Sequence, residues 1–338
     1  SEDAQEREDY MSIKWGVLGT ASIAAGCTIP GMKKAKNCEL YAIAGRDEAK
    51  VHSFREKYGF VKGYVGYDAL LADEAVQAVY IPLPNGLHYE WVIKALKAGK
   101  HVLCEKPITI NARQFQELTQ EAKKRHLFLM EAMWTVFFPV IDQAKKWIKA
   151  GKIGDITFIE ASLGWRLDMN PERRNANIKL GAGAILDIGT YPLHFGYIFA
   201  QSDVKQSSIM AHQLPSGVDL TESIQVEYEN GILAQYGSSV EVNMTNVATI
   251  TGKEGCLVFN DFHSPRKVSL IKEGKVVETF EDNRETAGYN YEAQETTDCI
   301  IKGQLESRLM PHSTSSRILS LMDNLRSKIH LQYEADRY

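Results

Sequence analysis

A lysine stands between a glutamate and a proline in the stretch LCEKPIT, which covers residues 103–109. The short apolar run before it predicts a buried strand, so Glu105, Lys106 and Pro107 would follow the carboxyl end of that strand. A lysine held there could serve a reaction as a charge or a proton donor, whereas the alternative is a solvated surface turn. The spacing alone leaves both interpretations open.

A second chemical signal follows the first predicted strand, where the chain reads GVLGTASIAAG. This is a G-x-A-x-x-A variant of the dinucleotide-binding fingerprint, in which small residues let the backbone approach a pyrophosphate at a helix N-terminus. Its position after the first strand of a βαβ unit favours a cofactor site over a tight turn without ligand. The predicted contacts are Gly19, Thr20, Ala21, Ser22, Ile23 and Ala24.

The end of the second predicted strand bears on the choice of nucleotide, because it reads IAGRDEAK. Gly45 leaves room there and Arg46 offers a guanidinium, with Lys50 one turn farther on, which suits the 2′-phosphate of NADP(H). The alternatives are that Asp47 reads the ribose of NAD(H), or that Asp47 caps the next helix and Arg46 is simply exposed. NADP(H) is the favoured cofactor and NAD(H) the alternative.

The fourth predicted strand runs into IPLPNGLHYEW. Two prolines and a glycine should keep this loop out of helical geometry until Leu87. Leu83, Pro84, Asn85 and His88 would then face the cofactor at the carboxyl edge of the sheet. Taken alone, Asn85 reads as a turn residue or helix cap and His88 as a surface histidine.

These motifs need a sheet to position them, and the first half of the chain supplies the pattern. Short apolar runs at 13–18, 40–44, 63–65, 78–81, 101–104 and 127–130 alternate with helical spacing at 49–58, 88–98 and 111–125. This predicts a doubly wound parallel sheet, an α/β Rossmann domain over residues 11–134. Past residue 153 alternating β patterns and turns predict an α+β domain over 135–338, with a large, open, mostly antiparallel sheet and a last helix near 315–328.

Composition sets limits on function. The 338 residues carry 39 basic and 43 acidic side chains, and residues 1–10 hold five acids and one arginine, which leaves 38 of each sign in the remainder. A neutral body predicts no nucleic-acid partner, and residues 1–10 read as a disordered or added acidic tail. Because the sequence shows no membrane span or signal core, we expect a cytoplasmic protein without a membrane partner. Because its cysteines and histidines are scattered, we expect neither a disulfide framework nor a metal site.

The segments GVLGTASIA, CEKPIT, MEAMW and GAILDIGTYPLHF, in this order and at these intervals, resemble the Gfo/Idh/MocA oxidoreductase family. The similarity is strongest to the branch that holds dimeric dihydrodiol and NADP-dependent D-xylose dehydrogenases. The resemblance implies a Rossmann domain followed by a domain whose open sheet carries oligomer contacts, here a homodimer or homotetramer.

The resemblance also implies roles for single residues. Glu105 would approach the nicotinamide ribose, Lys106 would point toward the substrate, and Pro107 would fix the turn through a cis peptide. Tyr191 would be the proton donor or acceptor, with Asp187 on the same helical face by its i,i+4 spacing. A phenol has a pKa near 10, and an ammonium group within roughly 4–6 Å lowers it, so Lys106 and Tyr191 make physical sense as a pair.

Four further residues are weaker candidates. His194 is a reserve proton relay, although a single histidine in an apolar helix is more often a hydrogen-bonded structural residue. Trp165 and Arg166 match a family dipeptide that reaches the cofactor, and the alternative is an aromatic strand end followed by a surface arginine. Tyr289 would close over the cleft.

The sequence therefore predicts an NADP(H)-dependent oxidoreductase acting on a CH–OH group of a sugar, polyol or cyclic diol. Lys106, Tyr191, Asp187 and His194 form the predicted catalytic set. Two alternatives stay open at this point. One is a glycosidase or lyase that oxidises its sugar transiently with a bound nicotinamide, and the other is a cofactor-binding sensor without enzymatic activity.

Overall fold

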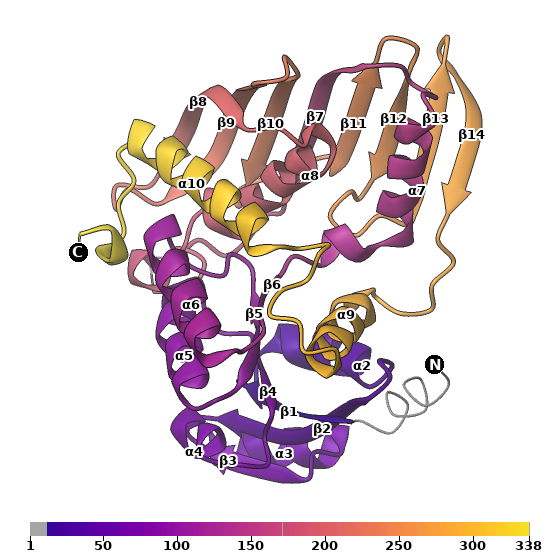
Figure 1. The fold of residues 1–338 in the computed structure, drawn as a ribbon. Helices are drawn as coiled ribbons and strands as arrows, with labels where there is room; N and C mark the ends of the chain where they lie inside the picture. The colour runs from indigo at the N-terminus through magenta and orange to yellow at the C-terminus, as the bar shows by residue number, and fades with distance from the viewer. Residues whose placement is uncertain (1–11, 171, 338) are drawn as a thin grey trace, which may run out of the picture. The chain divides into compact units, whose positions relative to one another are not determined.

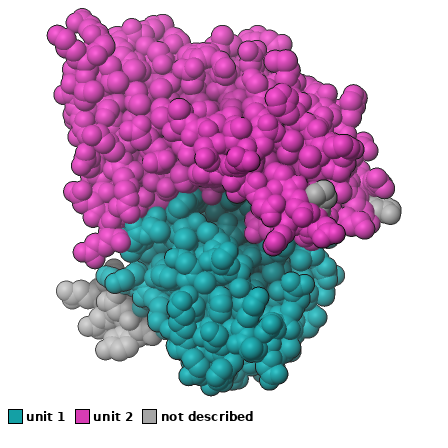
Figure 2. Space-filling model, turned by 180° about the vertical axis from the view of Figure 1, so that it is seen from behind, with its two compact units in different colours: residues 1–109, 113–134, 286–315 teal, residues 110–112, 135–285, 316–338 magenta. Residues whose placement is uncertain are grey.

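The computed structural model describes residues 12–170 and 172–337, so the predicted acidic tail at 1–10 lies outside the described residues. The chain forms two compact units, shown in different colours in Figure 2. Unit 1 comprises Ser1–Thr109, Arg113–Trp134 and Thr286–Ser315, and unit 2 comprises Ile110–Ala112, Thr135–Glu285 and Ser316–Tyr338. The predicted domain boundary at residue 134 stays a prediction. The compact units do not follow sequence position alone, because the segment 286–315 belongs to unit 1.

Unit 1 is built on a six-stranded parallel sheet with the order β3-β2-β1-β4-β5-β6 (Figure 1). Its central strands are apolar and buried almost throughout, as parallel strands covered on both faces must be. The predicted Rossmann architecture is confirmed. The strands are β1 (Ile13–Leu18), β2 (Cys38–Gly45), β3 (Lys62–Val65), β4 (Ala78–Ile81), β5 (His101–Glu105) and β6 (Leu129–Ala132).

Most helices of unit 1 connect these strands in the sequence, and one more comes from the far end of the chain. In sequence order they are η1 (Ala24–Thr28), α2 (Ile29–Met32), α3 (Glu48–Tyr58), α4 (Tyr67–Leu71), α5 (Asn85–Lys97), α6 (Ala112–Arg125) and α9 (Tyr289–Ile301). Helix α9 packs on α2 so closely that a Cβ at Gly31 would lie 2.8 Å from Tyr289 Cβ. The sequence pattern did not identify α9, which brings two side chains, Tyr289 and Glu292, to unit 1.

Unit 2 contains an eight-stranded sheet with the order β14-β13-β12-β11-β7-β10-β9-β8. All neighbouring pairs are antiparallel except β7 with β10, so the predicted mostly antiparallel sheet is confirmed. Strand β12 was not predicted. The strands are β7 (Ile156–Gly164), β8 (Val204–Gln213), β9 (Asp219–Tyr228), β10 (Leu233–Ser239), β11 (Val247–Gly252), β12 (Gly255–Asn260), β13 (Lys267–Lys272) and β14 (Lys275–Glu281).

One face of this sheet is covered by helices and the other is not. Helices α7 (Pro139–Lys149) and α8 (Thr190–Ala200) and the unit 2 part of α10 (His312–Lys328) lie over the covered face (Figure 1). A π-helical turn, η4 (Ile185–Gly189), leads directly into α8. Large apolar side chains stay exposed on the strands, among them Met210, Leu233, Val276 and Val277.

Candidate active site

The fingerprint loop of unit 1 follows β1 and has the backbone geometry that a glycine permits. Gly19 adopts a φ of +135°, and its N–H donates to the carbonyl oxygen of Ala44 at 2.9 Å. A Cβ at Gly45 would lie 3.1 Å from Thr20 Cγ2, so the ends of β1 and β2 approach each other here. Glycine at both places adds no side chain of its own, which fits the approach of a dinucleotide.

The end of β2 separates the roles that the sequence left open. Asp47 is the N-cap of α3 and accepts a hydrogen bond from the backbone N–H of Lys50 at 2.9 Å. The Asp47 carboxylate is thus engaged in capping, while the Arg46 and Lys50 side chains are exposed at the carboxyl end of the sheet. This arrangement presents positive charge where an adenosine ribose would lie in a Rossmann fold.

The loop after β4 differs from the sequence-based expectation. Helix α5 begins at Asn85 and not at Leu87, because Pro84 takes the N-cap position with φ −57° and ψ 146°. His88 is completely buried, so the alternative of a surface histidine is wrong. Its Nδ1 lies 2.7 Å from the carbonyl oxygen of Pro107 and its Nε2 lies 2.7 Å from that of Leu83. Both ring nitrogens of His88 therefore contact backbone carbonyl groups.

The turn after β5 contains the cis peptide Lys106–Pro107 and a fixed glutamate. Glu105 accepts a hydrogen bond from Tyr80 Oη at 2.6 Å, and that phenol also lies 2.9 Å from Thr28 Oγ1. Burial raises the pKa of Tyr80 well above its usual value, and Glu105 adds to the effect, so Tyr80 stays a neutral donor. Lys106 follows half-buried at the edge of the sheet.

Helix α9 adds an aromatic stack and a buried acid to unit 1. Tyr289 stacks on Trp134 with ring centroids 4.1 Å apart. Glu292, three residues on, is fully buried, and within the described residues neither of its carboxyl oxygens has a hydrogen-bond partner. Burial raises the pKa of Glu292 well above its ordinary value, and the Glu105 carboxylate raises it further, so both effects favour the neutral acid. No sequence signal singled out Glu292 or Tyr80.

In unit 2 the segment predicted to carry the proton chemistry is η4 followed by α8. Asp187 lies in η4, and Tyr191 and His194 lie in the first turns of α8. All three are buried, and Nη2 of Arg174 lies 3.9 Å from Oδ1 of Asp187. π-Helical turns within helices often occur at functional sites, because they re-aim the side chains that follow.

Two buried acids on β9 make hydrogen bonds in this part of unit 2. Asp219 accepts a hydrogen bond from the backbone N–H of Ile185 at 2.6 Å, and Glu222 accepts one from Ser238 Oγ at 2.5 Å. Burial raises the pKa of both carboxyl groups, and the Asp219 charge raises that of Glu222 further. Burial therefore favours a protonated form of the pair.

An unpredicted histidine joins two of the predicted residues of unit 2. The His263 ring meets Trp165 edge to face at 5.0 Å between centroids and Tyr191 at 5.8 Å. Thr135 Oγ1 donates to the His263 carbonyl oxygen at 2.6 Å. Arg166, next to Trp165, has an exposed side chain. No motif in the sequence marked His263, since it stands alone in a loop.

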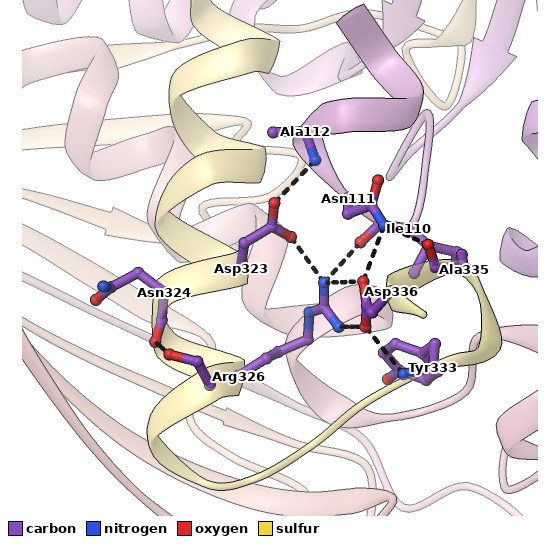
Figure 3. A network of polar contacts seen from close by, with 10 residues as sticks. Ile110, Asn111, Ala112, Asp323, Asn324, Arg326, Tyr333, Ala335 and Asp336 are labelled. Carbon is purple, nitrogen blue, oxygen red and sulfur yellow. Dashed lines mark hydrogen bonds and ion pairs between the residues drawn. The ribbon is translucent and has the colours of Figure 1, made fainter. Parts of the chain in front are cut away.

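A buried arginine anchors the C-terminal end of the chain (Figure 3). Arg326 pairs with Asp336 at 2.6 Å and with Asp323 at 2.7 Å, and its guanidinium lies 5.1 Å from the Tyr333 ring centroid. Tyr333 Oη in turn donates to the Ala182 carbonyl oxygen at 2.7 Å. This network fixes the chain three residues before η4.

Two kinds of feature are absent from the described part of the chain. Residues 12–170 and 172–337 contain no group of three or more His, Cys, Asp or Glu side chains arranged to hold a metal ion. Within the same ranges, none of the helices combines the length and apolar character needed to span a membrane.

Comparison with known proteins gives matches over nearly the whole chain. Residues 13–133 match the model described as oxidoreductase family, NAD-binding Rossmann fold, and residues 141–258 match the GFO/IDH/MocA C-terminal domain. The trans-1,2-dihydrobenzene-1,2-diol dehydrogenase of Xenopus laevis is 33% identical, and that of Homo sapiens 29%, over 96% and 97% of this chain and 100% of each relative.

Among solved structures, the chain is similar to KijD10, a 3-ketoreductase from Actinomadura kijaniata in complex with NADP and TDP-benzene. The identity is 29% and the TM-score 0.87, over 94% of this chain and 98% of KijD10.

Proposed function

The chain belongs to the GFO/IDH/MocA oxidoreductase family, and on this premise we propose that it transfers hydride between NADP(H) and a carbinol or carbonyl carbon of a sugar, polyol or cyclic diol. The predicted family and enzyme class, a nicotinamide-dependent oxidoreductase acting on CH–OH groups, are confirmed. The substrate class rests on relatives named as dehydrogenases of a cyclic diol and on a ketoreductase.

The single observation that carries the proposal is the turn after β5. Glu105 and Lys106 stand at the carboxyl end of a central parallel strand, where ligands of such sheets bind, and Tyr80 fixes the glutamate at 2.6 Å. The bound nicotinamide would supply the hydride chemistry. Glu105 would hold the ribose, and Lys106 would orient the reacting hydroxyl.

The proton must move with the hydride, and Tyr191 is the group we assign to it. A phenol near pKa 10 is a weak base at neutral pH, and a neighbouring ammonium charge strengthens it by stabilising the phenolate. We assign that charge to Lys106 and a substrate-orienting role to Asp187. His194, buried in the same helix, is held in reserve as a relay.

The preference for NADP(H) over NAD(H) rests on Arg46 and Lys50. Both are exposed at the end of β2, whereas the Asp47 carboxylate that would bind an NAD ribose is occupied as a helix cap. The other assigned cofactor contacts are Leu83, Pro84, Asn85, Trp165, Arg166 and Tyr289. We also assign a cytoplasmic location and, from the exposed apolar residues of the open sheet, a homodimer or homotetramer.

The test is a screen of the purified protein with NADP⁺ and NAD⁺ against aldoses, polyols and cyclic diols. The expected result is net formation of reduced nicotinamide with at least one substrate, faster with NADP⁺. Turnover of a sugar without net change in reduced nicotinamide would instead identify transient oxidation, as in a glycosidase or lyase. Binding of cofactor without turnover of any substrate would identify a sensor.

A further inference from the structure

The Pro107–Ile108 peptide, directly after the cis bond, is held from both ends by buried ionisable side chains. Its carbonyl oxygen lies 2.7 Å from His88 Nδ1, and its N–H donates to Glu131 Oε2 at 2.9 Å. Ser315 Oγ donates to the other oxygen of Glu131 at 2.8 Å. His88 is 0% exposed and Glu131 is 2% exposed.

The partners of His88 determine its protonation state. A carbonyl oxygen can only accept a hydrogen bond, and His88 places each ring nitrogen 2.7 Å from one, those of Pro107 and Leu83. A neutral imidazole carries a single N–H and can donate only once. Two donated hydrogen bonds therefore require the imidazolium, with a proton on each nitrogen.

A buried cation needs an anion nearby, and Glu131 is in place to provide it. The two groups are separated by one peptide unit, so the ring nitrogen and the carboxylate oxygen are at most about 8 Å apart. The peptide dipole between them points its oxygen toward the cation and its N–H toward the anion, which is the favourable orientation for both.

Other ionisable groups lie on the strands next to this turn. Burial raises the pKa of Tyr80 and of Cys104, and burial lowers that of His101, so these three are neutral at pH 7. The charged side chains on the same turn are Glu105 and Lys106. Glu131 is the anion that we pair with His88, because its carboxylate holds the other end of the same peptide.

We propose that His88 is a buried imidazolium which, together with Glu131, clamps the Pro107–Ile108 peptide and so fixes Lys106 in its working position. His88 and Glu131 are then positioning residues rather than cofactor contacts. The part of the proposal that concerns Lys106 rests on the proposed function, whereas the charge state of His88 does not.

The first experiment is nitrogen NMR of the intact protein labelled with ¹⁵N-histidine, followed across the pH range around 6.5, the ordinary imidazole pKa. His88, identified by the signal lost in His88→Gln, should show two protonated ring nitrogens at neutral pH and above. His101 is the internal reference, because its Nδ1 accepts from the Phe128 N–H at 2.9 Å and must be unprotonated. A neutral pattern for His88 at pH 7, like that of His101, would overturn the proposal.

The second experiment uses Glu131→Gln, whose amide oxygen can still accept from Ile108 and whose size is unchanged. The expected results are loss of the second His88 proton at a lower pH, and a fall in kcat of about 10- to 100-fold with an unchanged KM for NADP⁺. Wild-type kcat together with a wild-type His88 titration would overturn the proposal. If this variant does not fold, the wild-type spectrum alone decides.

A failure of the proposed function can be distinguished from a failure of the His88 proposal. If Lys106→Met retained wild-type kcat, the assignment of Lys106 would be lost. The charge state of His88 would still be decided by the nitrogen NMR spectrum.

Discussion

Replacing Glu222 with glutamine should stabilise unit 2 at neutral pH, by an amount that grows as the pH rises. Glu222 and Asp219 are neighbours on β9, and burial raises the pKa of both carboxyl groups, so the folded pair keeps a proton that the unfolded chain releases. Glutamine can accept from Ser238 as the acid does and can donate to Asp219 in place of the proton. The folded variant therefore carries the same charge as the folded wild-type pair.

The magnitude follows from one proton. An acid whose pKa is raised by folding contributes stability that is complete below the unfolded pKa, about 4.3 for glutamate, and is lost as the pH rises toward the folded pKa. Over that window the wild type loses about 1.4 kcal/mol of unfolding free energy per pH unit relative to the variant. Between about pH 5.5 and 7.5 the difference between Glu222→Gln and wild type should therefore grow, by up to about 2.7 kcal/mol.

The assay is urea denaturation of both proteins at these two pH values. Glu227→Gln is the matched control, because Glu227 is only half-buried on the same strand and its hydrogen bond with Lys205 lowers its pKa. Glu227 is ionised in both states throughout this range, so its variant should show no trend with pH. An equal difference between Glu222→Gln and wild type at both pH values would refute the shared buried proton.

Three other substitutions test separate parts of the site. Tyr191→Phe keeps the ring that packs on His263 but removes the proton, so kcat should fall about 10²- to 10⁴-fold with the NADPH Kd unchanged; steady-state kinetics with unaltered kcat would reject Tyr191 as the proton carrier. Arg46→Ser should raise the KM for NADP⁺ about tenfold or more and leave that for NAD⁺ unchanged, and an equal effect on both would remove Arg46 from 2′-phosphate binding. Arg326→Met leaves Asp323 and Asp336 without their counter-charge and should cost about 3–5 kcal/mol of unfolding free energy in urea, so a loss below about 1 kcal/mol would contradict the role of this network.

Much of the fold could be read from the sequence because short apolar runs and turn residues are local signals. Strand β4 is found at the residues predicted for it, 78–81, and the glycine and small residues after β1 occupy the loop expected of a fingerprint. The prediction failed at the start of α5 because two prolines were read as breakers. Pro84 is instead the N-cap, where a missing N–H costs nothing.

The residues that escaped prediction depend on contacts between segments far apart in the chain. Tyr80 reads as a core residue of a short strand, and only its 2.6 Å hydrogen bond to Glu105 reveals a polar role. Glu292 lies on a helix more than 180 residues after the strand that carries Glu105, so no local pattern joins the two. The sequence predicted His88 to face the cofactor, whereas its two ring nitrogens each lie 2.7 Å from a backbone carbonyl oxygen, which no spacing rule anticipates.

The most direct test of the central claim is a comparison of Lys106→Met with the wild type for two quantities, the NADPH Kd and the kcat for the best substrate of the screen. Methionine keeps the length of the side chain and removes the charge. The account predicts an NADPH Kd within about twofold of wild type and a kcat lower by about 10²-fold or more. A kcat equal to that of the wild type would contradict it.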